Sequence, residues 1–158
     1  MGFESITDQK IDELLELPKR VTNPKAREIT KGLHKQQNFT IKSDNGQEFT
    51  LYLRQNNIIA DDFSCGLLWH MPSGESLTIV RYNGSSHFHP NRLEETEIDF
   101  NCHVHKATQK YIESGLKPEG FATVSTKYST LNGALHWLIT DCNITGLPTT
   151  PENSDLFE

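Results

Sequence analysis

Several features of particular protein classes are absent from this chain. Its 158 residues include no run of lysine and arginine, and the formal net charge at pH 7 is −6. Binding along duplex DNA needs many cationic contacts to phosphates, so we expect no extended duplex-DNA binding. A local pocket for RNA stays compatible with this composition. An acidic surface also favours a basic protein partner.

Cysteine and long apolar segments are also scarce. The three cysteines, Cys65, Cys102 and Cys142, include no Cys-x-x-Cys pair, which argues against a zinc knuckle and a dithiol redox motif. The opening segment "MGFESITDQK" lacks the basic and apolar parts of a secretory signal. No apolar run approaches the ~18 residues that cross a bilayer. We therefore expect a cytoplasmic protein with reduced cysteines and no membrane partner.

The spacing of apolar residues changes along the chain. After Thr7 it is helical and predicts an N-terminal helix that Pro18 ends. Residues 19–37 are polar and fit either a connector or a weak helix. From Asn38 the period is two, and "DNG" predicts a β-hairpin. Helical spacing returns in "HKATQKYIESG" and in "TLNGALHWLITD", which Ser129 is expected to cap, with a linker between these two segments.

These segments predict an α+β fold with an antiparallel meander sheet of four to five strands. One helix precedes the sheet and two follow it. We expect a single domain over residues 1–144. Residues 145–158 contain two prolines and several acidic residues, so they are expected to form a loose acidic tail.

The segment from His87 to His105 holds four of the chain's seven histidines, as two His-x-His pairs. Side chains at positions i and i+2 of a strand lie on the same face. In "EIDFNCHVH" the even positions are apolar, so we expect them to face the core and the odd positions to face solvent. The even positions are Ile98, Phe100, Cys102 and Val104. The odd positions are Asp99, Asn101, His103 and His105.

The same alternation, continued back along the chain, adds Arg81 and Asn83 to the polar face, unless a bulge near Gly84 shifts it. We therefore predict one site on this face. The candidate catalytic residues are Arg81, His87, His103 and His105, and the candidate binding residues are Asn83, His89, Asp99 and Asn101.

The elements "FSCGL", "RYNG", "HVHKAT" and "YIESG" resemble a family of small bacterial and prophage proteins known as a domain of unknown function, over about residues 48–144. That resemblance implies the α+β fold outlined above and a bacterial or phage source. A second similarity is to TumE-like toxins of toxin–antitoxin pairs. It rests on Arg81-Tyr82-Asn83, on His87 with His89, and on His103-Val104-His105. Asn83 stands where those toxins have an aspartate, which puts any role for a carboxylate there in doubt.

The leading hypothesis is a histidine-dependent, ribonuclease-like protein of a toxin–antitoxin or prophage system, which requires no cofactor. One imidazole would take the 2′-OH proton, another would protonate the leaving oxygen, and Arg81 would stabilise the phosphorane charge. Its partners would be RNA and an antitoxin. The alternative is a non-enzymatic acidic protein that binds a nucleic-acid enzyme, as a prophage-encoded inhibitor or accessory factor.

Two further interpretations stay open. Imidazoles on a strand can bind Zn²⁺, so the chain could be a metal-dependent hydrolase. The candidate metal ligands are His87, His89, His103 and His105, with Glu97 and Asp99 as the nearby carboxylates. The last interpretation is that these residues form a polar sheet face without a function.

Overall fold

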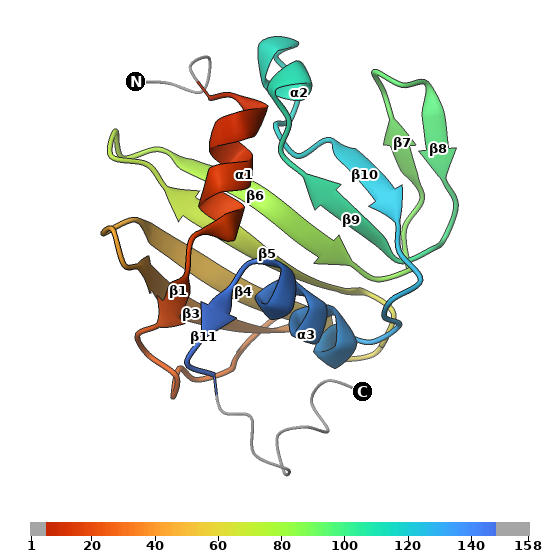
Figure 1. The fold of residues 1–158 in the computed structure, drawn as a ribbon. Coiled ribbons are helices and arrows are strands. Elements are labelled where there is room, and N and C mark those ends of the chain that lie inside the picture. Colours follow the sequence, from red (N-terminus) through yellow and green to blue (C-terminus); the bar gives the residue numbers. More distant parts are fainter. Residues whose placement is uncertain (1–5, 148–158) are drawn as a thin grey trace.

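The computed structural model describes residues 6–147, and it shows a large sheet with helices on one face (Figure 1). In chain order the elements are α1 (Asp8–Glu16), β1 (Lys19–Val21), β2 (Ile29–Lys31), β3 (His34–Ser43), β4 (Glu48–Asn56), β5 (Phe63–His70), β6 (Ser76–Asn83), β7 (His89–Asn91), β8 (Thr96–Ile98), β9 (His103–Lys106), α2 (Gln109–Glu113), β10 (Phe121–Val124), α3 (Leu131–Asp141) and β11 (Ile144–Thr145). The predicted α+β class is confirmed, as are a helix before the central strands and two helices after them.

The main sheet of the described chain has nine strands, in the order β10-β9-β6-β5-β4-β3-β1-β11, with β2 paired to β3. Its neighbouring strands are antiparallel except for β1 and β11, which are parallel. Strands β3 to β6 pair in chain order within this larger sheet, and the "DNG" turn joins the first two, with Gly46 at φ +87°. The prediction of four to five strands is wrong, because short strands of two to four residues widen the sheet on both sides. A strand of two to four residues shows too little alternation of apolar and polar residues to be recognised from the sequence.

Two regions that were expected to lie outside the sheet belong to it. Residues 19–37 contain β1, β2 and the start of β3 instead of a weak helix. The expected linker between the last two helices contains β10, which pairs with β9. The tail expected over 145–158 lies outside the described residues from position 148 onward. None of the helices within residues 6–147 is both long and apolar enough to cross a membrane.

Helices α1 and α3 pack on the same face of the sheet and cover its apolar side (Figure 1). Thr7 caps α1 as its side chain accepts from the backbone N–H of Lys10. The cap of α3 is Thr130, one residue after the expected Ser129. Lys19 is almost fully buried, and its Nζ donates to three backbone carbonyls that lie at the C-terminal ends of these two helices. A single side chain therefore joins both helices to β1.

The register of β6 and β9 determines which side chains lie on the other face. Arg81 is opposite His105, and Asn83 is opposite His103. The register between β5 and β6 shifts at Leu67, so the irregularity lies earlier than the position expected near Gly84. Because the shift precedes Arg81, the predicted common face of Arg81, Asn83, His103 and His105 is confirmed.

The prediction that residues 98–105 form one strand with its histidines facing solvent is wrong. Residues 99–102 separate β8, which pairs only with β7, from β9, which joins the main sheet. Phe100 is 64% exposed, whereas His103 and His105 are 1% and 3% exposed. Val104 does pack toward the core, but the opposite face of β9 is covered as well. The alternation of apolar and polar residues predicts the face on which a side chain lies only within one continuous strand. It cannot predict burial where both faces of the strand are covered.

Candidate functional site

Six of the eight predicted site residues come together in one pocket of about 560 Å³. It lies where β6 and β9 meet the β7–β8 hairpin and the loop that precedes β10. The six are Arg81, Asn83, His87, His89, His103 and His105. Asp99 and Asn101 are exposed and are not among the lining residues. The pattern of histidines thus located the pocket, although its cover was not foreseen.

Three of the imidazoles contact one another, and we call His89, His103 and His105 the histidine cluster. The centroid of the His89 ring is 4.5 Å from that of His105 and 5.7 Å from that of His103. The centroids of His103 and His105 are 5.0 Å apart. Strand β9 supplies two of these rings and the hairpin strand β7 supplies the third. The hairpin therefore completes the cluster and also shields it from solvent.

Each ring of the histidine cluster donates one N–H to a backbone carbonyl. The pairs are His89 Nε2 to Gly120, His103 Nδ1 to Asn101 and His105 Nδ1 to Glu119, at 2.7, 2.8 and 2.8 Å. A carbonyl can only accept, so these ring nitrogens carry the hydrogen. Within the described chain, every solvent-shielded side-chain nitrogen or oxygen has a hydrogen-bond partner. No such partner reaches Nε2 of His103 or His105 among these residues, and both residues line the pocket although they are almost fully buried.

Burial keeps the two β9 imidazoles neutral at physiological pH. It lowers the pKa of His105 to about 3, and the positive charge of Arg81 acts in the same direction. Burial also lowers the pKa of His103, although the hydrogen bond to Asn101 opposes this effect. A neutral imidazole with its hydrogen on Nδ1 has a lone pair on Nε2. The pocket is therefore lined by two hydrogen-bond acceptors from β9.

Two hydrogen bonds hold the guanidinium of Arg81. Its Nε donates to Asn83 Oδ1 at 3.0 Å, and its Nη1 donates to Glu119 Oε2 at 3.2 Å. The Tyr52 side chain is near enough that the charge of Arg81 opposes the rise that burial causes in the pKa of Tyr52. Tyr52, Gly66 and Arg81 are in register on three neighbouring strands. A Cβ on Gly66 would lie 2.5 Å from the Tyr52 hydroxyl, so glycine leaves the space in which Tyr52 reaches Arg81.

Positive charge predominates in the pocket of this acidic chain. Arg81, Arg92 and Lys117 line it together with one carboxylate, that of the buried Glu119. Glu119 forms ion pairs with Arg81 and, at 3.9 Å, with Lys117. Sequence reasoning missed Arg92, Lys117 and Glu119 because they lie outside the His-x-His pattern. Glu119 also falls in the segment that was expected to be a linker.

The proposed metal ligands line the pocket, but they do not form a metal site as they stand. Within residues 6–147, no group of three His, Cys, Asp or Glu side chains is arranged to hold a metal ion. His87 is exposed on the pocket wall, where its Nδ1 is 3.0 Å from Ser86 Oγ. Glu97 is exposed on β8 and is not among the lining residues.

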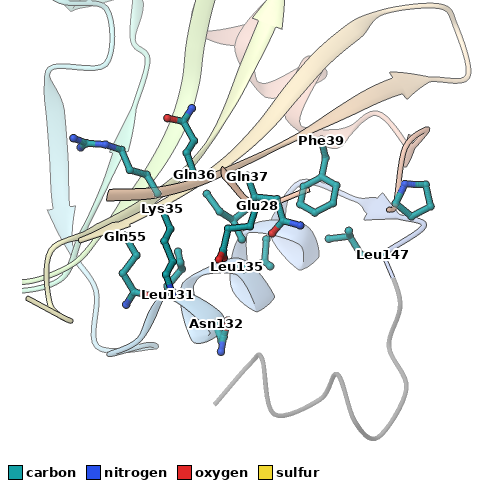
Figure 2. A pocket seen from close by; sticks show the side chains of 13 residues that line it. Glu28, Lys35, Gln36, Gln37, Phe39, Gln55, Leu131, Asn132, Leu135 and Leu147 are labelled. Atoms are coloured by element: carbon teal, nitrogen blue, oxygen red, sulfur yellow. The ribbon is translucent and has the colours of Figure 1, made fainter. Parts of the chain in front are cut away.

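A second pocket, of about 280 Å³, opens between β3, β4 and the start of α3 (Figure 2). Phe39, Leu131 and Leu135 form apolar parts of its wall, and Lys35 and Gln37 are among its polar residues. The described residues that line it include no histidine or cysteine. Histidines therefore gather in the first pocket instead, and we call that pocket the histidine pocket.

A family model described as "Family of unknown function (DUF6978)" matches residues 6–144. The chain belongs to this family. The predicted membership of a domain-of-unknown-function family is thereby confirmed. No curated protein and no solved structure matches the chain. The DUF6978 match covers every residue that lines the histidine pocket, so the pocket is part of the family domain.

Proposed function

We propose that this DUF6978 protein is a histidine-dependent phosphoryl-transfer enzyme that cleaves RNA as the toxin of a bacterial toxin–antitoxin or prophage system. The observation that carries the proposal is the unpaired Nε2 of neutral His103 in a pocket that also holds the guanidinium of Arg81. A base and a cation in one partly closed pocket are the groups that phosphodiester transesterification needs. The surplus of cations in the pocket supports a phosphate substrate.

His103 is the proposed general base. Its Nε2 takes the proton from the ribose 2′-OH, and the 2′ oxygen attacks the phosphorus. General-base catalysis of this kind contributes about 10²- to 10⁴-fold in rate. His105 is less suited to this role because its pKa, lowered to about 3, makes it a weak base. His105 instead occupies the position directly opposite Arg81.

Arg81 and His87 complete the proposed mechanism. Arg81 stabilises the negative charge that grows on the phosphorane oxygens, and its bonds to Asn83 and Glu119 keep the guanidinium in place. His87, on the solvent-exposed wall, protonates the 5′ oxygen as the bond between phosphorus and that oxygen breaks. The products are a 2′,3′-cyclic phosphate and a 5′-hydroxyl.

The test is cleavage of a fluorogenic single-stranded RNA by the purified full chain and its variants. His103→Asn and Arg81→Lys should each lower kcat by about 100-fold or more. The matched control is His70→Asn, which changes an exposed histidine that bonds Thr50 and Ser76 elsewhere on the sheet. Circular dichroism and thermal melting show whether each variant is folded. Absence of cleavage by the wild type, or full activity of folded Arg81→Lys and His103→Asn, would contradict the proposal.

An exposed apolar surface favours a second candidate function, that of a non-enzymatic interaction protein. Leu33 and the neighbouring Ile58 and Ile59 are exposed, and the Asn57 N–H donates to the Leu33 carbonyl at 2.8 Å. The two loops that carry these side chains are thus joined. Exposed apolar groups that lie together are typical of protein-binding surfaces. This candidate gains support if Ile58→Ser abolishes binding of a partner while the wild type leaves RNA intact.

A further inference from the structure

The histidine pocket presents hydrogen-bond acceptors where a site built for a bare phosphate would present donors. Both β9 imidazoles hold their Nδ1–H against a backbone carbonyl, so neither can turn that hydrogen toward a ligand without losing a buried hydrogen bond. The lone pair on each Nε2 repels a phosphate oxygen and attracts a hydroxyl group. His103 and His105 therefore favour a ligand that donates O–H groups.

The same pocket also offers positive charge for an anion. Arg92 and Lys117 belong to its lining, and Arg81 is adjacent to the two imidazoles through the pairing of β6 with β9. A ligand that satisfies both features carries hydroxyl groups next to a negative charge. A ribose that bears a phosphate has this combination, whereas a deoxyribose phosphate lacks the 2′-hydroxyl donor.

An aromatic side chain at the pocket supplies a third element of recognition. Phe88 lies between His87 and His89, is 47% exposed and lines the pocket. An apolar ring left open beside polar ligand-binding groups is suited to stacking on a nucleobase. Bases in a duplex already stack on both faces, so such a contact needs an unpaired nucleotide.

We infer that the pocket recognises one nucleotide of single-stranded RNA. Its ribose 2′-hydroxyl donates its one hydrogen to Nε2 of a β9 histidine, its phosphate lies near Arg81, and its base stacks on Phe88. This inference rests on the proposed function for its choice of a nucleic-acid ligand, but it concerns recognition and not bond cleavage. It assigns ribose selectivity to His103 and His105, and base affinity to Phe88.

The experiment compares binding of adenosine 3′-monophosphate and 2′-deoxyadenosine 3′-monophosphate to the full chain by titration calorimetry at neutral pH. A chelator keeps metal ions out of the measurement. The ribonucleotide should bind about fivefold more tightly, as one additional hydrogen bond predicts. Phe88→Leu should weaken binding of both nucleotides about tenfold and leave their ratio unchanged.

The matched control is Phe100→Leu, which alters an exposed phenylalanine that does not belong to the pocket lining. Its affinities should equal those of the wild type. Equal affinity for the two nucleotides, binding of neither, or wild-type affinity in Phe88→Leu would overturn the inference. Neither nucleotide contains the bond that the proposed reaction breaks. Ribose-selective binding by a chain that leaves RNA intact would therefore reject the reaction and keep the inference.

Discussion

Arg81 and His105 are directly opposite each other on β6 and β9, on the face of the sheet turned away from α1 and α3. A permanent cation is thereby placed beside a buried imidazole. The Glu119 residue links the two, because its carboxylate accepts from Arg81 and its backbone carbonyl accepts from His105 Nδ1. Protonation of His105 would add a second positive charge next to Arg81 without a solvent shell, which is unfavourable in the folded chain.

The first prediction concerns the dependence of stability on pH. The pKa of His105 is about 3 in the folded chain against 6.5 for a free side chain, so between these values the unfolded chain binds more protons. Stability contributed by the neutral imidazole is complete above pH 6.5 and falls as the pH drops, by up to ~1.4 kcal/mol per pH unit. The lowered pKa of His103 acts in the same direction.

Urea unfolding at several pH values between neutral and mildly acidic checks this prediction on the wild type and His105→Gln. The variant lacks the titrating group, so its stability should fall less steeply as the pH decreases. The control is His70→Gln, at an exposed position, and its stability should depend on pH as steeply as that of the wild type. The same slope in the wild type and His105→Gln would show that His105 does not govern acid sensitivity.

The second prediction concerns the space above Gly66. Gly66→Ala places a methyl group where the Tyr52 ring lies, and should destabilise the fold by ~1–3 kcal/mol. It should also displace Tyr52 from Arg81 and reduce any activity of the pocket. Urea unfolding checks the first effect. In a Tyr52→Ala background, Gly66→Ala should lower the free energy of unfolding by clearly less. An equal loss in both backgrounds would show that Gly66 and Tyr52 act independently.

The third prediction concerns the buried lysine. Lys19 donates at 2.8, 2.8 and 2.7 Å to the carbonyls of Leu15, Leu17 and Cys142. Lys19→Met leaves these carbonyls without their donor and should lower the free energy of unfolding by ~3 kcal/mol. Arg20→Met, at the exposed neighbouring position, is the control and should change stability by less than ~0.5 kcal/mol. Equal stabilities of the two variants would contradict the role of Lys19 as a shared helix cap.

The fourth prediction separates two histidines of the pocket by their burial. His103→Ala removes an almost fully buried ring and its hydrogen bond, and should destabilise the fold by ~2–3 kcal/mol. His87 is exposed, so His87→Ala should stay within ~0.5 kcal/mol of the wild type. Thermal melting of both variants provides the comparison. A large loss in His87→Ala would show that the pocket wall also stabilises the fold.

Sequence patterns predicted the α+β class, the hairpin at "DNG" and the common face of the polar residues that β6 and β9 carry. They succeeded where one strand ran continuously, as with Arg81 and Asn83 in β6. They failed at residues 99–102, where the chain leaves the β7–β8 hairpin before it enters β9. No local signal marks that break, because alternation happens to continue through it. Burial of His103 and His105 was missed because the hairpin and the Glu119–Gly120 backbone cover them, and such long-range contacts leave no periodic pattern.

The products of RNA cleavage test the central claim most directly. Incubation of a single-stranded RNA with the full chain in the presence of a chelator, followed by mass spectrometry of the fragment ends, distinguishes the competing mechanisms. Transesterification through the 2′-OH predicts 2′,3′-cyclic phosphate and 5′-hydroxyl ends, formed without metal and lost in the folded His87→Ala variant. Intact RNA, or 5′-phosphate ends that form only after Zn²⁺ is added, would contradict the account.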